Sequence, residues 1–152
     1  MGYCIQEALR LNPVATTTSL LKFENDTRLG NLRYKANTMC VVNMFGLHRN
    51  AKQWQRPHEY LPDRFDPDNE LSLTPDGKKR HNFSWLPFSG GKRICFGKTF
   101  AEFVIKMLIT MMTQRFEMSF VEKEKFSKGK LPMKVINQSH MPKLWVQLKE
   151  RK

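Results

Sequence analysis

The feature that most constrains this chain is a cysteine between a glycine-rich turn and a long apolar stretch. Cys95 follows the adjacent glycines Gly90 and Gly91, which permit a tight backbone path, and precedes a helix that apolar periodicity predicts over residues 96–116. The sulfur is therefore expected at the mouth of a helix, where the helix dipole and the nearby Arg93 cation favour a thiolate. A thiolate predicts a metal ligand or a nucleophile, and an inert buried cysteine is the plain alternative.

Composition predicts one globular unit with a basic surface. The 152 residues are enough for one ordinary domain, and three separated cysteines predict neither a disulfide framework nor a zinc or iron–sulfur site. The formal net charge of +12 is typical of proteins that bind nucleic acid, a membrane surface or an acidic protein. The basic residues accompany no nucleic-acid motif, so a nucleic-acid or membrane-surface module rests on charge alone. We expect no signal peptide and no bilayer-spanning stretch in this chain.

The first third of the chain predicts one helix followed by β-structure. Good helix formers with periodic apolar residues predict a helix over residues 3–11, which Pro13 ends. Residues 14–43 are rich in β-branched side chains and predict a small antiparallel sheet. Within it we expect a tight hairpin at 29–32 and a buried strand at 38–43.

The rest of the chain alternates irregular and regular segments. Residues 44–54 predict one short helical turn, and the prolines of 57–75 predict a long irregular segment. Such a segment needs an anchor, and Arg64 is expected to fold back onto Glu7 of the first helix. Three strands are expected after the long helix, at residues 116–120, 133–136 and 144–148. The last two are predicted to form a terminal hairpin.

The cysteine region resembles a known signature. Phe88-x-x-Gly91-x-Arg93-x-Cys95-x-Gly97 is similar to the heme-binding motif of the cytochrome P450 family. In that family the cysteine thiolate is the proximal ligand of heme iron. The resemblance implies heme b, iron protoporphyrin IX, as the cofactor of this chain.

Two further motifs carry the same resemblance. Glu7-x-x-Arg10 looks like the family's K-helix pair, and residues 57–65, which contain Arg64, resemble the aromatic and arginine motif of its meander region. The order of the three motifs implies a C-terminal portion of the family fold. The implied fold class is α+β, mainly α in the full-length family, with residues 1–152 as a single partial domain. Its parts would be a K-helix, small antiparallel sheet, meander, cysteine loop, long L-helix and terminal β-hairpin.

The resemblance implies roles for the residues of the cysteine region. Cys95 would ligate the iron, and its thiolate would push electron density onto the metal and favour cleavage of the O–O bond. Gly91 would turn loop amides toward the sulfur, and Phe88 would shield the sulfur from water. Arg93 is placed to pair with a heme propionate, because its fork matches a carboxylate.

The resemblance also implies supporting residues. Gly97 and Ala101 would leave room for the porphyrin close to the helix backbone. Glu7, Arg10 and Arg64 would form a buried structural triad that fixes the meander against the first helix and does no chemistry.

By resemblance, the full-length family member is a monooxygenase that inserts one oxygen atom into a small apolar substrate. Electrons would come from a reductase that docks on a basic proximal face made of Lys92, Lys98 and Lys106. Segments 14–20 and 138–141 would line the substrate pocket, with ordinary strand and turn as an equal alternative. The family location would be the cytosolic face of the endoplasmic reticulum, held by an N-terminal membrane anchor outside this chain.

The sequence also departs from the family pattern. Val14 and Leu21 stand where the family has a proline and a propionate-binding arginine, and His48 is assigned to a surface or packing role. The chain begins inside an expected helix and lacks the distal part of the active site. The alternative function is therefore a truncated, non-catalytic fragment with weak or no heme binding, and whether this chain is itself an enzyme stays open.

Overall fold

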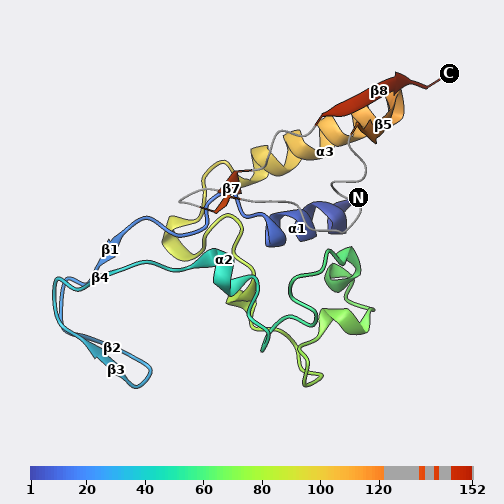
Figure 1. The fold of residues 1–152 in the computed structure, drawn as a ribbon. Coiled ribbons are helices and arrows are strands. Elements are labelled where there is room, and N and C mark those ends of the chain that lie inside the picture. The colour runs from blue at the N-terminus through green and yellow to red at the C-terminus, as the bar shows by residue number, and fades with distance from the viewer. Residues whose placement is uncertain (122–133, 136–138, 141–144, 152) are drawn as a thin grey trace.

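The computed structural model describes residues 1–121, 134–135, 139–140 and 145–151. Two longer helices and a short one are joined by 3₁₀ turns and by two-stranded ladders (Figure 1). In chain order the helices and strands are α1 (Gly2–Leu11), β1 (Leu21–Lys22), β2 (Thr27–Leu29), β3 (Leu32–Tyr34), β4 (Met39–Cys40), α2 (Met44–Leu47), α3 (Lys98–Arg115), β5 (Phe116–Phe120), β6 (Lys134–Val135), β7 (Ser139–His140) and β8 (Val146–Glu150).

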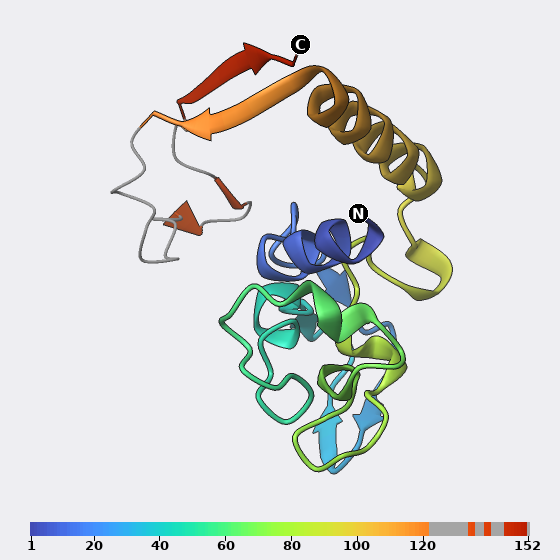
Figure 2. The same cartoon turned by 90° about the vertical axis from the view of Figure 1, so that its right-hand side faces the viewer.

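Helix α1 lies along the edge of the body formed by the first hundred residues, on the side nearest α3 (Figure 2). It ends before a fully buried proline, Pro13, as the sequence predicts. Its buried residues are Ile5, Glu7 and Arg10. Two of these three residues are charged, so the buried face of α1 is mainly polar and not part of a hydrophobic core.

The predicted hairpin is present between β2 and β3. The strands pair antiparallel with Leu29 opposite Leu32, and Gly30 in the connection has a φ of +58°. A positive φ is readily adopted by glycine, which explains why the turn forms there. A second antiparallel ladder pairs β1 with β4.

The prediction of a buried strand at 38–43 is wrong. Strand β4 covers only Met39–Cys40, and the side chains of Met39 and Val41 are 51% and 50% exposed. Strand propensity reports a fit to a half-buried pleated surface, and in the described residues no further strand pairs with this ladder. The β-branched pattern therefore predicted strand character correctly and burial incorrectly.

Residues 44–84 form the irregular part of the fold and contribute Met44 and Trp54 to its small core. Helix α2 is the predicted short turn, and the Asn43 side chain caps it by accepting a hydrogen bond from Gly46 N–H at 2.8 Å. Three short 3₁₀ turns follow, at Pro62–Phe65 (η1), Glu70–Ser72 (η2) and Asn82–Ser84 (η3). Buried apolar side chains in the described chain are Ile5, Met44 and Trp54.

Helix α3 extends away from this body (Figure 2). It forms where the apolar period predicts it, yet none of its residues is buried, and Phe100 and Phe103 are 74% and 62% exposed. The predicted apolar face is thus uncovered in the described part of the chain. Among the described residues, none of the helices combines the length and the apolarity needed to cross a bilayer.

The terminal strands pair differently from the prediction. Strand β5 occupies Phe116–Phe120 as expected, but it pairs antiparallel with β8, from Phe116 opposite Glu150 to Phe120 opposite Val146. The terminal hairpin joins β6 to β7, so the predicted pairing of 133–136 with 144–148 is wrong. The five-residue ladder with β5 satisfies more backbone groups of β8 than a short hairpin would. Residues 133, 136 and 144 lie outside the described residues.

Candidate functional site: the cysteine loop and its buried support

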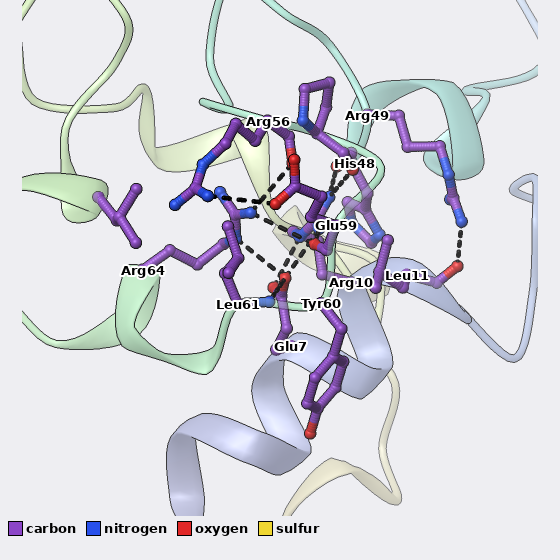
Figure 3. A network of polar contacts seen from close by, with 12 residues as sticks. Glu7, Arg10, Leu11, His48, Arg49, Arg56, Glu59, Tyr60, Leu61 and Arg64 are labelled. Atoms are coloured by element: carbon purple, nitrogen blue, oxygen red, sulfur yellow. Dashed lines mark hydrogen bonds and ion pairs between the residues drawn. The ribbon is translucent and has the colours of Figure 1, made fainter. Parts of the chain in front are cut away.

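The Glu7 carboxylate is the centre of a buried polar cluster that joins α1 to the irregular segment. Arg10 donates to it twice, from Nε to Oε2 at 2.7 Å and from Nη2 to Oε1 at 2.8 Å (Figure 3). Arg64 Nε and the backbone N–H of Leu61 each donate to Oε1 at 2.9 Å. The three charged side chains are completely buried. The structure thus brings together the three residues that the sequence grouped as a structural triad.

The two guanidiniums also fix the backbone of the irregular segment. Arg10 donates to three carbonyl oxygens, those of His48, Pro57 and Glu59, at 2.7, 2.7 and 3.0 Å. With the two bonds to Glu7, one hydrogen bond exists for each of the five N–H groups of Arg10. Arg64 donates to two further carbonyls, those of Gln55 and Arg56, at 2.7 and 3.2 Å. A lysine could not replace either arginine in this geometry.

Two members of this cluster were missed by sequence reasoning. Trp54 is 1% exposed, and the guanidinium carbons of Arg80, Arg10 and Arg64 lie 4.4, 5.1 and 5.9 Å from its ring centroid. Arg80 donates to the carbonyls of Leu71 and Arg64 at 2.8 and 2.5 Å, and burial lowers its pKa to about 10. The one sequence feature that could have indicated these members is Trp54 itself, because it is a lone large aromatic residue in a polar stretch. We call the group the Glu7 cluster, defined as Glu7, Arg10, Trp54, Arg64 and Arg80.

The charges of the Glu7 cluster are unequal. It holds three guanidiniums and one carboxylate, so the carboxylate alone does not neutralise it. Backbone carbonyl oxygens and the face of Trp54 supply the remaining negative potential, because a guanidinium over an indole face is attracted by the ring quadrupole. Removal of the single carboxylate is therefore the most damaging change available in this cluster.

His48 lies between the Glu7 cluster and the cysteine region. Its side chain is completely buried, its carbonyl oxygen accepts from Arg10, and its Nε2 accepts from the backbone N–H of Leu86 at 2.8 Å. Burial, with the cations of Arg10 and Arg49 adding to it, lowers the pKa of His48 to about 4. The imidazole is therefore neutral near pH 7, in agreement with a packing role and not a surface one.

The cysteine loop, which we define as residues 88–97, is closed by backbone bonds. The N–H of Cys95 donates to the carbonyl of Phe88 at 2.9 Å, and the N–H of Ser89 donates to the carbonyl of Leu86 at 3.1 Å. Gly91 has a φ of +66° and Ser89 a φ of +62°. The expected tight path thus exists at Gly91, and Ser89 shares the left-handed conformation that only glycine adopts without cost.

Cys95 lies at the start of α3, as the sequence predicts. It is a free and exposed cysteine, and its carbonyl oxygen accepts from Lys98 N–H at 3.3 Å. Gly97 is the N-cap of α3, and a Cβ at Gly97 would be 3.9 Å from the sulfur of Cys95. Ala101 N–H donates to the Gly97 carbonyl at 2.8 Å, which places this small residue on the first turn of the helix. The N-cap next to the sulfur therefore carries no side chain.

A cavity of about 860 Å³ opens between the cysteine loop and the segment that follows α1. Its lining residues fall mainly between positions 15 and 21 and between positions 89 and 94. That volume lies in the range of ~300–1,000 Å³ typical of ligand sites. Gly91 and Arg93 line this cavity. The other predicted cofactor residues do not line it, namely Phe88, Cys95, Gly97 and Ala101.

The donor set of this region fits a heme better than a protein-built metal centre. The described residues contain no group of three or more His, Cys, Asp or Glu side chains placed to hold a metal ion. A single exposed cysteine suits an iron whose porphyrin supplies the other in-plane ligands. Arg93, exposed on the cavity wall, offers a guanidinium to a carboxylate such as a propionate.

The predicted basic face comes from the loop and from α3. Lys92 lies in the loop's 3₁₀ turn Gly91–Arg93 (η4), Lys98 is the first residue of α3, and Lys106 lies further along the same helix. Lys92 and Lys106 are exposed and Lys98 is partly buried. Among the ion pairs of the described residues, none includes these three lysines. Their charges are therefore available to a partner.

Comparisons with known proteins agree with this arrangement. The family model described as cytochrome P450 matches residues 1–144. The steroid 17-alpha-hydroxylase/17,20 lyase of Bison bison is 34% identical over 129 residues, which are 84% of this chain and 23% of that protein. The cytochrome P450 monooxygenase FGM1 of Gibberella zeae is 37% identical over 106 residues, which are 70% of this chain and 20% of that protein. The chain thus spans less than a quarter of the length of these curated relatives.

The structure is also similar to solved cytochrome P450 structures. The solved structure of the retinoic acid bound cyanobacterial CYP120A1 superposes with a TM-score of 0.80 at 24% identity, covering 98% of this chain and 32% of that one. The helices and small antiparallel ladders described above are those of the C-terminal portion of that fold. The chain belongs to the cytochrome P450 family, whose cofactor is heme.

Proposed function

We propose that this chain is the heme-ligating segment of a cytochrome P450 monooxygenase and that Cys95 ligates the heme iron. The observation that carries the proposal is the position of Cys95. It is a free, exposed cysteine at the mouth of α3, held in a closed loop by its N–H bond to Phe88. The ligand of the iron would be the thiolate form of this side chain. The positive φ of Gly91 produces the turn on which this placement depends.

Other loop and helix residues would hold and orient the heme. Arg93 would pair with a propionate, and partly buried Phe88 would limit water at the sulfur. Gly97 and Ala101 present no large side chain on the first turn of α3, so the porphyrin could approach the backbone. When bound, a thiolate-ligated heme supplies the O₂ activation needed to insert one oxygen atom into a substrate.

The substrate proposed for the whole protein is small and apolar. Leu20, Leu21 and Val42 contribute apolar walls to the cavity beside the cysteine loop, which supports this class. The segments 14–20 and 138–141 would act as parts of the substrate wall, although residues 138 and 141 lie outside the described residues.

Electrons would reach the heme from a reductase. Lys92, Lys98 and Lys106 would form the docking face, because complementary charge on an acidic reductase speeds association. An endoplasmic reticulum location through an N-terminal anchor is proposed for the whole protein on the family resemblance alone.

A second candidate function is a non-catalytic segment that holds heme weakly or not at all. The exposure of α3 favours it, since Phe100, Phe103 and Met111 are 74%, 62% and 59% exposed in the described structure. A heme bound beside such an uncovered helix would be open to water, where side reactions compete with productive chemistry.

Loading the chain with hemin distinguishes the two candidates. The reduced, carbon monoxide-treated protein should show a Soret band strongly red-shifted from that of a histidine-ligated heme. Cys95→Ala should abolish the shift, whereas the matched control Cys4→Ala, at another exposed free cysteine, should retain it. Absence of heme uptake would favour the second candidate. A red-shifted band that survives Cys95→Ala would overturn the assignment of the ligand.

A further inference from the structure

We infer that His48 is a positioning residue for the cysteine loop, which it ties to the Glu7 cluster through one side-chain and one backbone hydrogen bond. Its importance for activity rests on the proposed function, because the loop matters for catalysis only if Cys95 ligates the heme. The tie itself can be measured without heme, so the two proposals fail separately.

The connection consists of two hydrogen bonds, one to the backbone and one to the side chain of His48. The His48 carbonyl oxygen accepts from Arg10 Nη1 at 2.7 Å, and the His48 Nε2 accepts from the backbone N–H of Leu86 at 2.8 Å. Arg10 and Leu86 each lie 38 residues from His48 in the sequence, one before it and one after it. His48 therefore connects α1 to the entrance of the cysteine loop across segments that the chain itself does not link closely.

Leu86 passes the tie on to the loop. Its carbonyl accepts from Ser89 N–H at 3.1 Å, and its Cδ2 lies 3.1 Å from the point where a Cβ on Gly90 would be. Phe88 follows two residues after Leu86, and its carbonyl oxygen accepts a hydrogen bond from the N–H of Cys95 at 2.9 Å. A displacement of Leu86 would therefore be transmitted to the backbone that carries Cys95.

The direction of the bond defines the required imidazole form. Leu86 donates an N–H, so Nε2 of His48 must carry no proton, and a neutral ring then holds its proton on Nδ1. Nδ1 has no hydrogen-bond partner among the described residues.

Two substitutions separate positioning from packing. His48→Phe keeps a planar ring of similar size and removes the acceptor. His48→Gln removes the ring and can place its Oε1 near the position of Nε2. If His48 only fills space, phenylalanine is the milder change; if it positions the loop, glutamine is the milder change.

The measurement is amide hydrogen exchange of the whole chain without heme, followed by NMR. We expect the Leu86 amide to exchange about tenfold faster in His48→Phe, the loss of one hydrogen bond, while the amides of α1 keep their protection. His48→Gln should restore most of the protection of Leu86. Equal exchange in the two variants, or greater protection in His48→Phe, would overturn the inference.

The unmodified chain gives a second test that does not depend on a variant folding. The ¹⁵N chemical shifts of the His48 ring distinguish a protonated from an unprotonated nitrogen. The inference requires Nε2 to be unprotonated near neutral pH. A proton on Nε2 would contradict the Leu86 bond and with it the positioning role.

Discussion

Glu7, Arg10 and Arg64 are completely buried, whereas Cys95 and Arg93 of the cysteine loop are exposed. The buried group is satisfied by residues of this chain, with Glu7 bonded to two arginines and to a backbone N–H. The exposed loop offers a thiol and a guanidinium that have no charged partner among the described residues.

The difference in burial indicates different roles for the two regions, structural support for the Glu7 cluster and ligand binding for the cysteine loop. The Glu7 cluster holds the irregular segment against α1 and leaves its charged groups unavailable to a ligand. The cysteine loop presents reactive groups at the surface and beside a cavity. Stability should therefore respond most to changes in the cluster, and heme binding should respond most to changes in the loop.

The largest expected effect is the loss of the buried carboxylate. Glu7→Gln leaves three guanidiniums without an anionic partner and should lower the free energy of unfolding by about 3–5 kcal/mol, measured by urea denaturation. The matched control is Glu59→Gln, because Glu59 also pairs with an arginine three residues away, Arg56, but on the surface at 3.2 Å. That control should cost less than about 1 kcal/mol. Equal losses would show that burial does not distinguish the two pairs.

An intermediate effect is expected from His48 on acidification. Burial lowers its pKa from 6.5 to about 4, so between these values the unfolded state binds a proton that the folded state does not. The free energy of unfolding should fall by about 3 kcal/mol as the pH drops across this range, and His48→Gln should remove this component. The comparison is cleanest above about pH 5, where carboxylates scarcely titrate. Parallel stability curves for the two proteins would contradict the buried neutral state.

The smallest effect should come from the backbone of the loop. Gly91→Ala forces a side chain into a φ of +66° with no other atom within 4 Å, so the cost is conformational, about 1 kcal/mol. Gly2→Ala, in helix α1 and equally free of contacts, should be neutral or stabilising. Thermal unfolding of both variants measures the difference. A neutral Gly91→Ala would remove the argument that this glycine is required by the turn.

The sequence predicted the local elements well because their signals are local. The ends of α1, the hairpin at Gly30 and the start of α3 follow from proline, glycine and apolar periodicity. The contact of Arg64 with Glu7 was expected because a long proline-rich segment needs an anchor.

The remaining features depend on contacts between distant segments. Trp54 and Arg80 join the Glu7 cluster from positions that carry no periodic signal. Strand β8 pairs with β5 and not with the predicted partner segment 133–136. Strand propensity does not determine which strand becomes the partner. The burial of 38–43 was wrong for a related reason, because propensity says nothing about what covers a strand.

The central claim, that Cys95 is the heme ligand, is tested most directly by resonance Raman spectroscopy of the hemin-loaded ferric chain. An iron–sulfur stretching band should appear and should move to lower frequency when cysteine is labelled with a heavy sulfur isotope. Cys95→Ala should abolish the band, and Cys4→Ala should leave it unchanged. A heme-loaded chain without an isotope-sensitive band, or with one that persists in Cys95→Ala, would contradict the claim.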